Sequence, residues 1–412
     1  MRIAFTGDLL ITTDLSVVTA AGRLDALRTW LGGADAVFGN LETVIHDYQF
    51  PPAARAGGTW LRAPVDVAAQ LAGFGVSAVS VANNHSCDYG TDGLLHSIQA
   101  LHAAGIATAG GGPTLTHASA PARVPVAGTS VATVAATTTA PLEASAADEA
   151  YGIPARPGVF RIAFSDKTVL PSAQYDNIAE IARMFDNATP DDELVYDGTI
   201  YVRGDRIALV STPHPDDLRQ LVSAVTDARS RSDMVTVSLH SHEGNGRWEE
   251  PSDVLVALAH AAADAGASVV WCHGPHLVRG VERRGDAIIF YSLGSLFFQV
   301  RGVDRQPAAM RRLAKLPADA TLPQIWAHRY DYLARPAYRE SIVPVCTWTG
   351  GRLTGVQLAA FILDHTDGDT YGLPRPATAE EANTVAGRIN ELSAGWSTKV
   401  SADHTGTLTM HL

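Results

Sequence analysis

Histidine, aspartate, glutamate and asparagine residues form five groups, and each group follows a short apolar run that predicts a strand. The groups are Asp8; Asn40 and Glu42; Asn84 and His85; His240 and His242; and His273 and His276. Side chains of these types supply the mixed nitrogen and oxygen ligands of a metal centre. One such residue alone is weak evidence, because an aspartate after a strand is commonly a helix cap. Five groups in equivalent positions favour one shared site.

The elements that carry these groups alternate between strands and helices. We expect strands over Arg2–Phe5, Ala36–Phe38, Ala78–Ala82, Met234–Leu239 and Ser268–Cys272. We expect helices over Arg23–Leu31, Val65–Phe74, Leu94–Ala103, Asp216–Ala228 and Pro251–Ala265. Such alternation predicts an α/β fold in which helices cover a sheet. The carboxyl ends of its strands converge on one crevice, which is where such folds bind ligands.

Two blocks interrupt this alternation, and we interpret both as insertions over a core. They span about residues 140–205 and 301–340 and contain aromatic residues that a disordered linker would lack. We expect one main domain over residues 1–365, closed by a hairpin at Ile342–Trp348 and Arg352–Ala360, and a C-terminal extension over 366–412.

The overall composition excludes several classes of protein. The chain has 412 residues and a formal net charge of −12, which argues against nucleic-acid binding because that relies on Lys and Arg. No apolar run is long enough to span a membrane, and the N-terminus runs directly into a strand, so we expect a cytoplasmic protein. Cys87, Cys272 and Cys346 make neither a disulfide framework nor a thiolate zinc site, and we expect the first two to be small buried hydrophobes.

The strongest signal is a set of short motifs that occur in a fixed order. They are Gly7-Asp8, Asn40-Leu41-Glu42-Thr43, Ala82-Asn83-Asn84-His85 with Asp88-Tyr89-Gly90, Ser238-Leu239-His240, His273-Gly274-Pro275-His276, and the run from Phe290 to Phe297. Together they resemble the CapA family of capsule and poly-γ-glutamate biosynthesis proteins, a branch of the calcineurin-like metallophosphoesterase superfamily. The resemblance covers residues 1–300 apart from the block at 140–205.

This resemblance implies a four-layer α/β sandwich of the metallophosphoesterase type, with two divalent metal ions (Mn, Fe, Zn or Co) at the strand ends. It assigns Asp8 and His276 to the first ion, Glu42 to a bridging position, and Asn84, His240 and His273 to the second ion. His85 is then the general acid and Asp88 orients it, while Asn40 lies outside the metal ligands. In such a site the ions lower the pKa of a bound water and polarise the oxygen that is attacked.

The sequence departs from the superfamily pattern at several positions. Leu10 stands where a histidine ligand is usual, Cys272 replaces a glycine, and Ser295-Leu296 replaces an Asn-Phe pair. After His240, where the family has Trp-Gly, this chain has Ser241-His242. His242 replaces a lost ligand, serves as a second proton donor in catalysis, or binds nothing.

Three functions agree with these residues. The first is a metal-dependent hydrolase that cuts an amide or γ-glutamyl-type peptide bond in a small or peptide-like anionic substrate. The second is a phosphoesterase, and the third is a non-catalytic subunit in polymer (poly-γ-glutamate or capsule) biosynthesis. The run Arg301, Arg305, Arg311 and Arg312 either holds substrate carboxylates or forms a solvated face. The remaining histidines, His46 among them, are expected on surfaces or helix faces. Nothing in the sequence predicts the oligomeric state.

Overall fold

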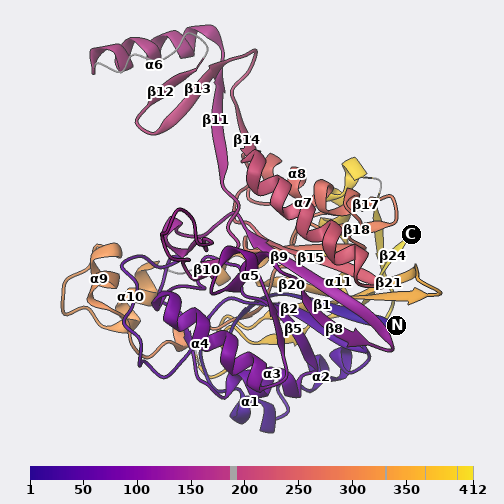
Figure 1. Ribbon diagram of the computed structural model, residues 1–412. Helices are drawn as coiled ribbons and strands as arrows, with labels where there is room; N and C mark the ends of the chain where they lie inside the picture. The colour runs from indigo at the N-terminus through magenta and orange to yellow at the C-terminus, as the bar shows by residue number, and fades with distance from the viewer. Residues whose placement is uncertain (186–192, 330–331, 367, 397, 412) are drawn as a thin grey trace.

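The computed structural model describes residues 1–185, 193–329, 332–366, 368–396 and 398–411 (Figure 1). Two large sheets form the body of the protein, and a third, smaller sheet lies in an arm that projects from it (Figure 1). Residues 186–192 and 330–331, which fall inside the two predicted insertions, lie outside the described residues.

The first sheet has ten strands among the described residues, and the N-terminal strand lies near its middle. In order across the sheet its strands are β23 (Lys399–Ala402), β24 (Thr407–His411), β21 (Arg352–Leu363), β20 (Glu340–Thr349), β1 (Arg2–Leu10), β2 (Ala36–Leu41), β5 (Val76–Ser80) and β6 (Ala107–Ala109), with β19 (Ser295–Phe298) beside β1 and β22 (Pro374–Pro376) beside β21. The strand β1 is parallel to β2 and β19 and antiparallel to β20. Residues 366–412, expected as an extension, thus contribute β22, β23 and β24 to this sheet, and the predicted division of the chain into domains stays a prediction.

The second sheet has six strands among the described residues. In order they are β17 (Val281–Arg284), β18 (Ala287–Phe290), β16 (Val269–His273), β15 (Met234–His240), β9 (Thr129–Thr137) and β8 (Ala122–Val126). The central strands β9, β15, β16 and β18 run parallel, so the carboxyl ends of β15 and β16 meet at one edge. Both faces of these central strands are buried, which explains why their sequences are almost continuously apolar.

The two sheets pack face to face, and helices cover both outer faces. Between the sheets, Phe5 and Phe38 of the first meet Trp271 of the second, with ring centroids 5.0 Å apart for Phe5 and Trp271. The outer face of the first sheet is covered by α1 (Ser16–Ala20), α2 (Asp25–Leu31), α3 (Val67–Gly73) and α4 (Gly90–Ala103). The outer face of the second is covered by α5 (Leu115–Ser119), α7 (Pro215–Ser230) and α8 (Asp253–Asp264). The fold is therefore the predicted four-layer α/β sandwich.

The arm is formed by residues 164–213, of which 186–192 are not described. It contains α6 (Ser172–Met184) and a sheet with the strand order β12 (Leu194–Tyr196), β13 (Thr199–Arg203), β11 (Phe164–Leu170) and β14 (Ala208–Pro213). Its apolar cluster of Leu170, Tyr175, Ala182 and Leu194 is separate from the clusters of the sandwich. Figure 1 shows α6 and the ends of these strands standing away from the body.

The remaining elements surround one edge of the sandwich. Two short ladders pair β3 (Val44–Ile45) with β4 (Arg62–Ala63) and β7 (Gly111–Gly112) with β10 (Gly158–Val159). The second block contributes α9 (Ala308–Leu313) and α10 (Leu322–Arg329), which pack with Leu10, Trp60 and Phe298 in one cluster. The helix α11 (Ala379–Leu392) packs on β21 and β24. Among the described residues, no helix is long and apolar enough to cross a membrane, and the cytoplasmic location stays a prediction.

Candidate metal centre

Asp8 lies inside β1 rather than after it, at an irregularity in the strand. The register of β1 shifts between Phe5 and Asp8 against β2, and between Asp8 and Leu9 against β19. Such bulges re-aim side chains beside functional sites. The residue before it, Gly7, allows a close approach, because a Cβ there would lie 1.8 Å from the carbonyl oxygen of Gly294.

The Asp8 carboxylate is fully buried, and three nitrogen atoms lie within hydrogen-bond distance of its oxygens. Its Oδ1 accepts from Asn40 Nδ2 at 3.0 Å, its Oδ2 accepts from Gly274 N at 3.1 Å, and Nδ1 of His276 lies 3.1 Å from Oδ2. Burial by itself raises the pKa of Asp8, but the hydrogen bond from His276 and the nearby imidazoles lower that pKa well below its usual range. Asp8 is therefore an anion suited to hold a cation.

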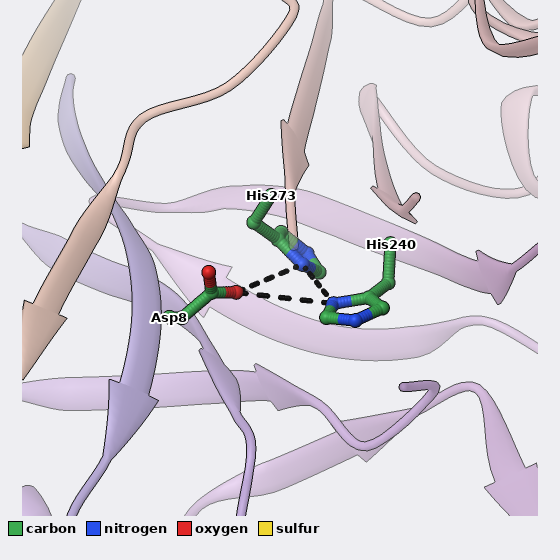
Figure 2. Close-up of side chains that lie close together, drawn as sticks. All are labelled: Asp8, His240 and His273. Carbon is green, nitrogen blue, oxygen red and sulfur yellow. Dashed lines mark hydrogen bonds and ion pairs between the residues drawn. The ribbon is translucent and has the colours of Figure 1, made fainter. Parts of the chain in front are cut away.

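His240 and His273 are the last residues of β15 and β16 and are direct partners in the parallel ladder. Figure 2 shows both imidazoles turned toward Asp8. Nδ1 of His240 lies 2.9 Å from Nδ1 of His273, and these two atoms lie 3.8 Å and 3.5 Å from Asp8 Oδ1. Burial lowers the pKa of His240 well below the ordinary value and that of His273 to about 4. Both rings are neutral at pH 7, the form that binds metals.

Glu42 follows β2 and is the least satisfied group of the site. Its side chain is fully buried, and neither carboxylate oxygen has a hydrogen-bond partner. Oε1 lies 3.7 Å from His240 Nε2 and 3.9 Å from His242 Nε2. Burial first and the charge of Asp8 second raise the pKa of Glu42 well above its ordinary value. A buried carboxylate without donors is costly unless a cation compensates its charge.

Asn84 joins this cluster from the loop after β5. Its Oδ1 lies 2.8 Å from His240 Nε2, while its Nδ2 donates to the carbonyl of Gly57 at 2.9 Å. The neighbouring Asn83 donates to Asn40 Oδ1 at 3.1 Å and so connects this loop to the partner of Asp8. The amide oxygen of Asn84 therefore faces the histidines and its nitrogen faces away.

His276 enters the site through a strained turn. Its backbone has φ 58°, a left-handed conformation that is uncommon for a residue other than glycine. Strain of this kind is commonly stored at functional sites. Its Nδ1 lies 3.0 Å from the hydroxyl of Ser295 as well as near Asp8. The same turn begins with Gly274 at φ +116°.

His85 and Asp88 form a pair beside the cluster. Nδ1 of His85 lies 2.7 Å from Asp88 Oδ2, and the buried Asp88 also accepts from the backbone N–H groups of Gly57 and Leu61 at 3.0 and 2.8 Å. Burial raises the pKa of Asp88, although His85 and these hydrogen bonds oppose the shift. Asp88 thereby fixes the orientation of the His85 ring.

A small cavity opens onto these residues. It is lined by Leu10, Gly57, Gly58, Thr59, Leu61, Asn84, His85, His242, His276, Phe298, Val300 and Tyr332. Those lining residues include neither Lys nor Arg, and none comes from the block at 140–205. The arginines considered for substrate binding lie elsewhere: the guanidinium groups of Arg301 and Arg305 lie over Tyr371 and Tyr48, and Arg311 donates to the carbonyl of Ala320.

The structure brings together all six residues predicted as metal ligands. Two groups have ligand atoms within 4.8 Å of one another: Asp8 with His240 and His273, and Glu42 with His242 and His276. The roles of these residues, and those of His85, Asp88 and His242 in catalysis, stay predictions.

Sequence reasoning missed the contact of Ser238, whose hydroxyl lies 2.7 Å from His273 Nε2. The available signal was its position two residues before His240, which puts both side chains on one face of the strand. Sequence reasoning also placed His46 on a surface, which is wrong, because His46 is fully buried against Tyr89.

The donor set fits divalent cations. Carboxylate, imidazole and amide oxygen groups converge, burial lowers the pKa of His240, His242 and His273, and neither oxygen of the Glu42 carboxylate has a hydrogen-bond partner. Cys87 and Cys272 are not part of the set. Burial raises the pKa of the Cys87 thiol to about 12 and raises that of Cys272 further, so both remain protonated. Cys272 is buried as expected, whereas Cys87 is only partly buried.

A sandwich of this architecture, with nitrogen and oxygen donors at the strand ends of both sheets, defines a metallophosphoesterase-like protein. More specifically, the chain belongs to the family of the bacterial capsule synthesis protein PGA_cap, whose model matches residues 2–300. Two proteins of Sinorhizobium fredii, named uncharacterized protein y4sH and uncharacterized protein y4uA, are each 29% identical to it over 96% of this chain and 90% of their own length. The PGA biosynthesis protein CapA of Bacillus subtilis is 34% identical over 20% of this chain and 22% of its own length. Membership relates this chain to capsule biosynthesis.

Proposed function

We propose that this protein is a metal-dependent hydrolase that cuts an amide or γ-glutamyl-type peptide bond. The observation that carries the proposal is the buried Glu42 carboxylate, which has no hydrogen-bond partner and lies among three imidazoles and Asn84. Glu42 in the bridging position, with Asp8 and His276 on one side, Asn84 and His240 on the other, and His273 between Asp8 and His240, would hold two divalent ions. Bound there, the ions would lower the pKa of a water and polarise the attacked oxygen.

His85 supports the chemistry of bond cleavage. It lies on the cavity wall beside His276, and its Nδ1 contact with Asp88 leaves Nε2 as the atom that can give a proton to a leaving amine. General acid catalysis of this kind contributes ~10²–10⁴-fold to a rate. Proton donation is most valuable for amines, which are poor leaving groups without a proton.

The lining of the cavity favours an amide over a phosphate ester. Leu10, Leu61, Phe298 and Val300 give it apolar walls, and no Lys or Arg is among its described lining residues. Enzymes that transfer phosphoryl groups commonly place cationic side chains around the phosphate oxygens. A neutral amide needs no such groups.

The test combines metal analysis with two substrates. The purified protein is dialysed against Mn²⁺ or Co²⁺, its metal content is measured, and it is assayed on a γ-glutamyl anilide and on a chromogenic phosphodiester. We expect two ions per chain, loss of at least one ion in Glu42→Ala and in His273→Ala, and hydrolysis of the anilide. The exposed His404 provides the control His404→Ala, which retains both ions.

The other outcomes contradict the proposal in distinct ways. Hydrolysis of the phosphodiester alone would make the protein a phosphoesterase. Full metal content without activity on either compound would support the non-catalytic role in polymer biosynthesis. Absence of bound metal would remove the basis of the proposal.

A further inference from the structure

We propose that His242 is a ligand of the cation held by Glu42, Asn84 and His240, and that Glu243 is the positioning residue for it. The inference rests on the metal site proposed above and adds a nitrogen donor to it. It also assigns a role to a segment, residues 241–252, that joins the end of β15 to α8.

Four ligand atoms surround one point of the site. Nε2 of His240 lies 2.8 Å from Asn84 Oδ1, 3.0 Å from His242 Nε2 and 3.7 Å from Glu42 Oε1. His242 Nε2 lies 3.9 Å from the same Glu42 oxygen. Atoms that each lie ~2 Å from one ion are separated by roughly 3–3.5 Å, so this spacing suits a shared cation.

The contact between the two imidazoles is compatible with such a cation. Nδ1 of His240 lies 2.9 Å from His273 Nδ1, while its Nε2 lies 3.0 Å from His242 Nε2 and 2.8 Å from Asn84 Oδ1. A neutral imidazole has one N–H and one lone pair. With the N–H of His240 on Nδ1, toward His273, the lone pairs of His240 Nε2 and His242 Nε2 and the oxygen of Asn84 are all free to bind one cation.

The orientation of His242 favours a ligand over a proton donor. Its Nε2 is turned to His240 and Glu42, and its ring lies 5.0 Å from the His240 ring and 5.3 Å from the His276 ring. Leu10 lines the cavity beside it and has no donor atom in its side chain. His242 thus adds a nitrogen donor on the side of Glu42 and His240.

Glu243 ties the segment that carries His242 to the second sheet. Its carboxylate accepts hydrogen bonds from the hydroxyls of Thr138, Thr139 and Ser241 at 2.6, 2.7 and 2.6 Å. Thr139 Oγ1 in turn accepts from the backbone N–H of His242 at 2.9 Å. The Glu243 side chain thus links the residues that follow β9 to those that follow β15.

Two further contacts hold the segment from behind. The fully buried Arg279 donates from Nη2 to the carbonyl of Glu243 and from Nε to the carbonyl of Trp248, both at 2.9 Å. Gly274 leaves room for the imidazole, since a Cβ there would lie 3.0 Å from His242 Cδ2. Positioning of this kind fixes ring orientation before a metal arrives, and losing such support typically costs ~10–100-fold in metal affinity.

The experiment is a Co²⁺ titration of the full chain, followed by metal analysis and by the visible d–d spectrum, which reports the ligands of the ion. We expect His242→Ala to weaken one of two Co²⁺ ions by ~100-fold and to change its spectrum, with recovery on adding imidazole. Glu243→Ala should weaken the same ion by ~10-fold. Glu250→Ala, at a partly exposed glutamate of the same segment, and His404→Ala, at an exposed histidine, are the matched controls and should titrate as wild type.

The remaining outcomes separate this inference from the proposed function. If Glu42→Ala loses cobalt while His242→Ala keeps wild-type affinity and spectrum, His242 is no ligand and only this inference fails. If the wild type binds no cobalt, the proposed function fails with it. Should His242→Ala not fold, diethyl pyrocarbonate labelling of the wild type decides. Protection of His242 by Co²⁺ supports the inference, and equal labelling with and without Co²⁺ overturns it.

Discussion

At the scale of single residues, Gly7 shows how closely the structure is packed around the first ligand. The strand β1 approaches the turn before β19 so tightly that a methyl group at position 7 would meet the carbonyl of Gly294. We expect Gly7→Ala to lower the free energy of unfolding by ~1–3 kcal/mol, the typical cost of overpacking. We also expect it to weaken metal binding, because the added methyl group would displace the neighbouring Asp8. Urea unfolding and a metal titration measure the two effects.

The matched control is Gly355→Ala. Gly355 also lies in a strand of the first sheet, but a Cβ there would meet no atom within 4 Å. We expect its stability to stay within ~0.5 kcal/mol of wild type. If Gly7→Ala and Gly355→Ala changed stability equally, the close contact between Gly7 and the carbonyl of Gly294 would not be the cause of the loss.

The pair His85 and Asp88 allows a prediction about leaving groups. Replacing Asp88 by Asn keeps the volume and removes the negative charge that orients His85. We expect Asp88→Asn to slow hydrolysis of unactivated γ-glutamyl amides by ~10²-fold or more and that of an activated anilide much less, with unchanged metal content. A uniform loss on all substrates, together with loss of metal, would contradict the role of His85 as the proton donor.

The ligand positions could be predicted from the sequence, but their contacts could not. Asn84 and His273 follow recognisable apolar runs, so their places at or just after strand ends were predictable, whereas Asp8 lies inside β1. The partners of Glu243 and the burial of His46 were not, since they depend on which strand ends become neighbours across the sandwich. A hydrogen bond such as that from Thr138 to Glu243 joins residues over a hundred positions apart in sequence and leaves no local pattern.

At the scale of secondary-structure elements, the helix α11 begins with a capping box. Thr378 accepts from the N–H of Glu381, and the Glu381 carboxylate accepts from the N–H of Thr378 and pairs with Arg375. The hydrogen bonds from Arg375 lower the pKa of Glu381 to about 2, against the opposing effect of burial. Because the folded-state pKa is depressed, this stabilisation is present above pH ~4.5 and is lost as the pH falls through about 2.

We therefore expect Glu381→Gln to cost ~1 kcal/mol of stability at neutral pH, a modest value because water screens the pair. The difference from wild type should shrink between pH 5 and pH 2 and vanish below that range. Urea unfolding across this range is the measurement, and the adjacent exposed Glu380→Gln is the control. A difference that is constant with pH would show that the charge of Glu381 does not contribute.

The elements themselves were largely predictable, and the exceptions are informative. The strand Met234–His240 and the helix Pro215–Ser230 fall within two residues of their predicted bounds because apolar periodicity and a helix-starting proline mark them. The strand β1 is longer than predicted, since Gly7 and Asp8 read as a turn but form a bulge within the strand. The first predicted insertion, residues 140–205, contains residues of the sandwich before Phe164 and residues of the arm from Phe164 onward. Amino-acid composition alone does not distinguish these two parts.

At the scale of the whole molecule, the arm is expected to be dispensable for the sandwich. Asp166 and Ser211 are partners near its base, so their Cα atoms lie only ~5 Å apart and a short Gly-Ser linker can join them. Ser211 stays in place because its Oγ accepts a hydrogen bond from the backbone N–H of Val254 in α8. The apolar cluster of the arm is its own. We expect a protein with residues 167–210 replaced by such a linker to keep its thermal unfolding temperature within a few degrees and to bind the same number of metal ions. Calorimetry and metal analysis test this, and loss of metal would show that the arm supports the site.

The central position of β1 has a consequence for how the chain is made. This strand leaves the ribosome long before its neighbour β20, which begins only at Glu340. At ~5–20 residues per second, a nascent chain carries β1 with one open edge for on the order of 20–60 s. Ile3, Ala4 and Phe5 are apolar, so this edge is open to mispairing with other growing chains until β20 has been made. Asp8 lies on the same strand, so the residues of the candidate metal centre assemble on a strand whose second edge is closed only after all of them have been made.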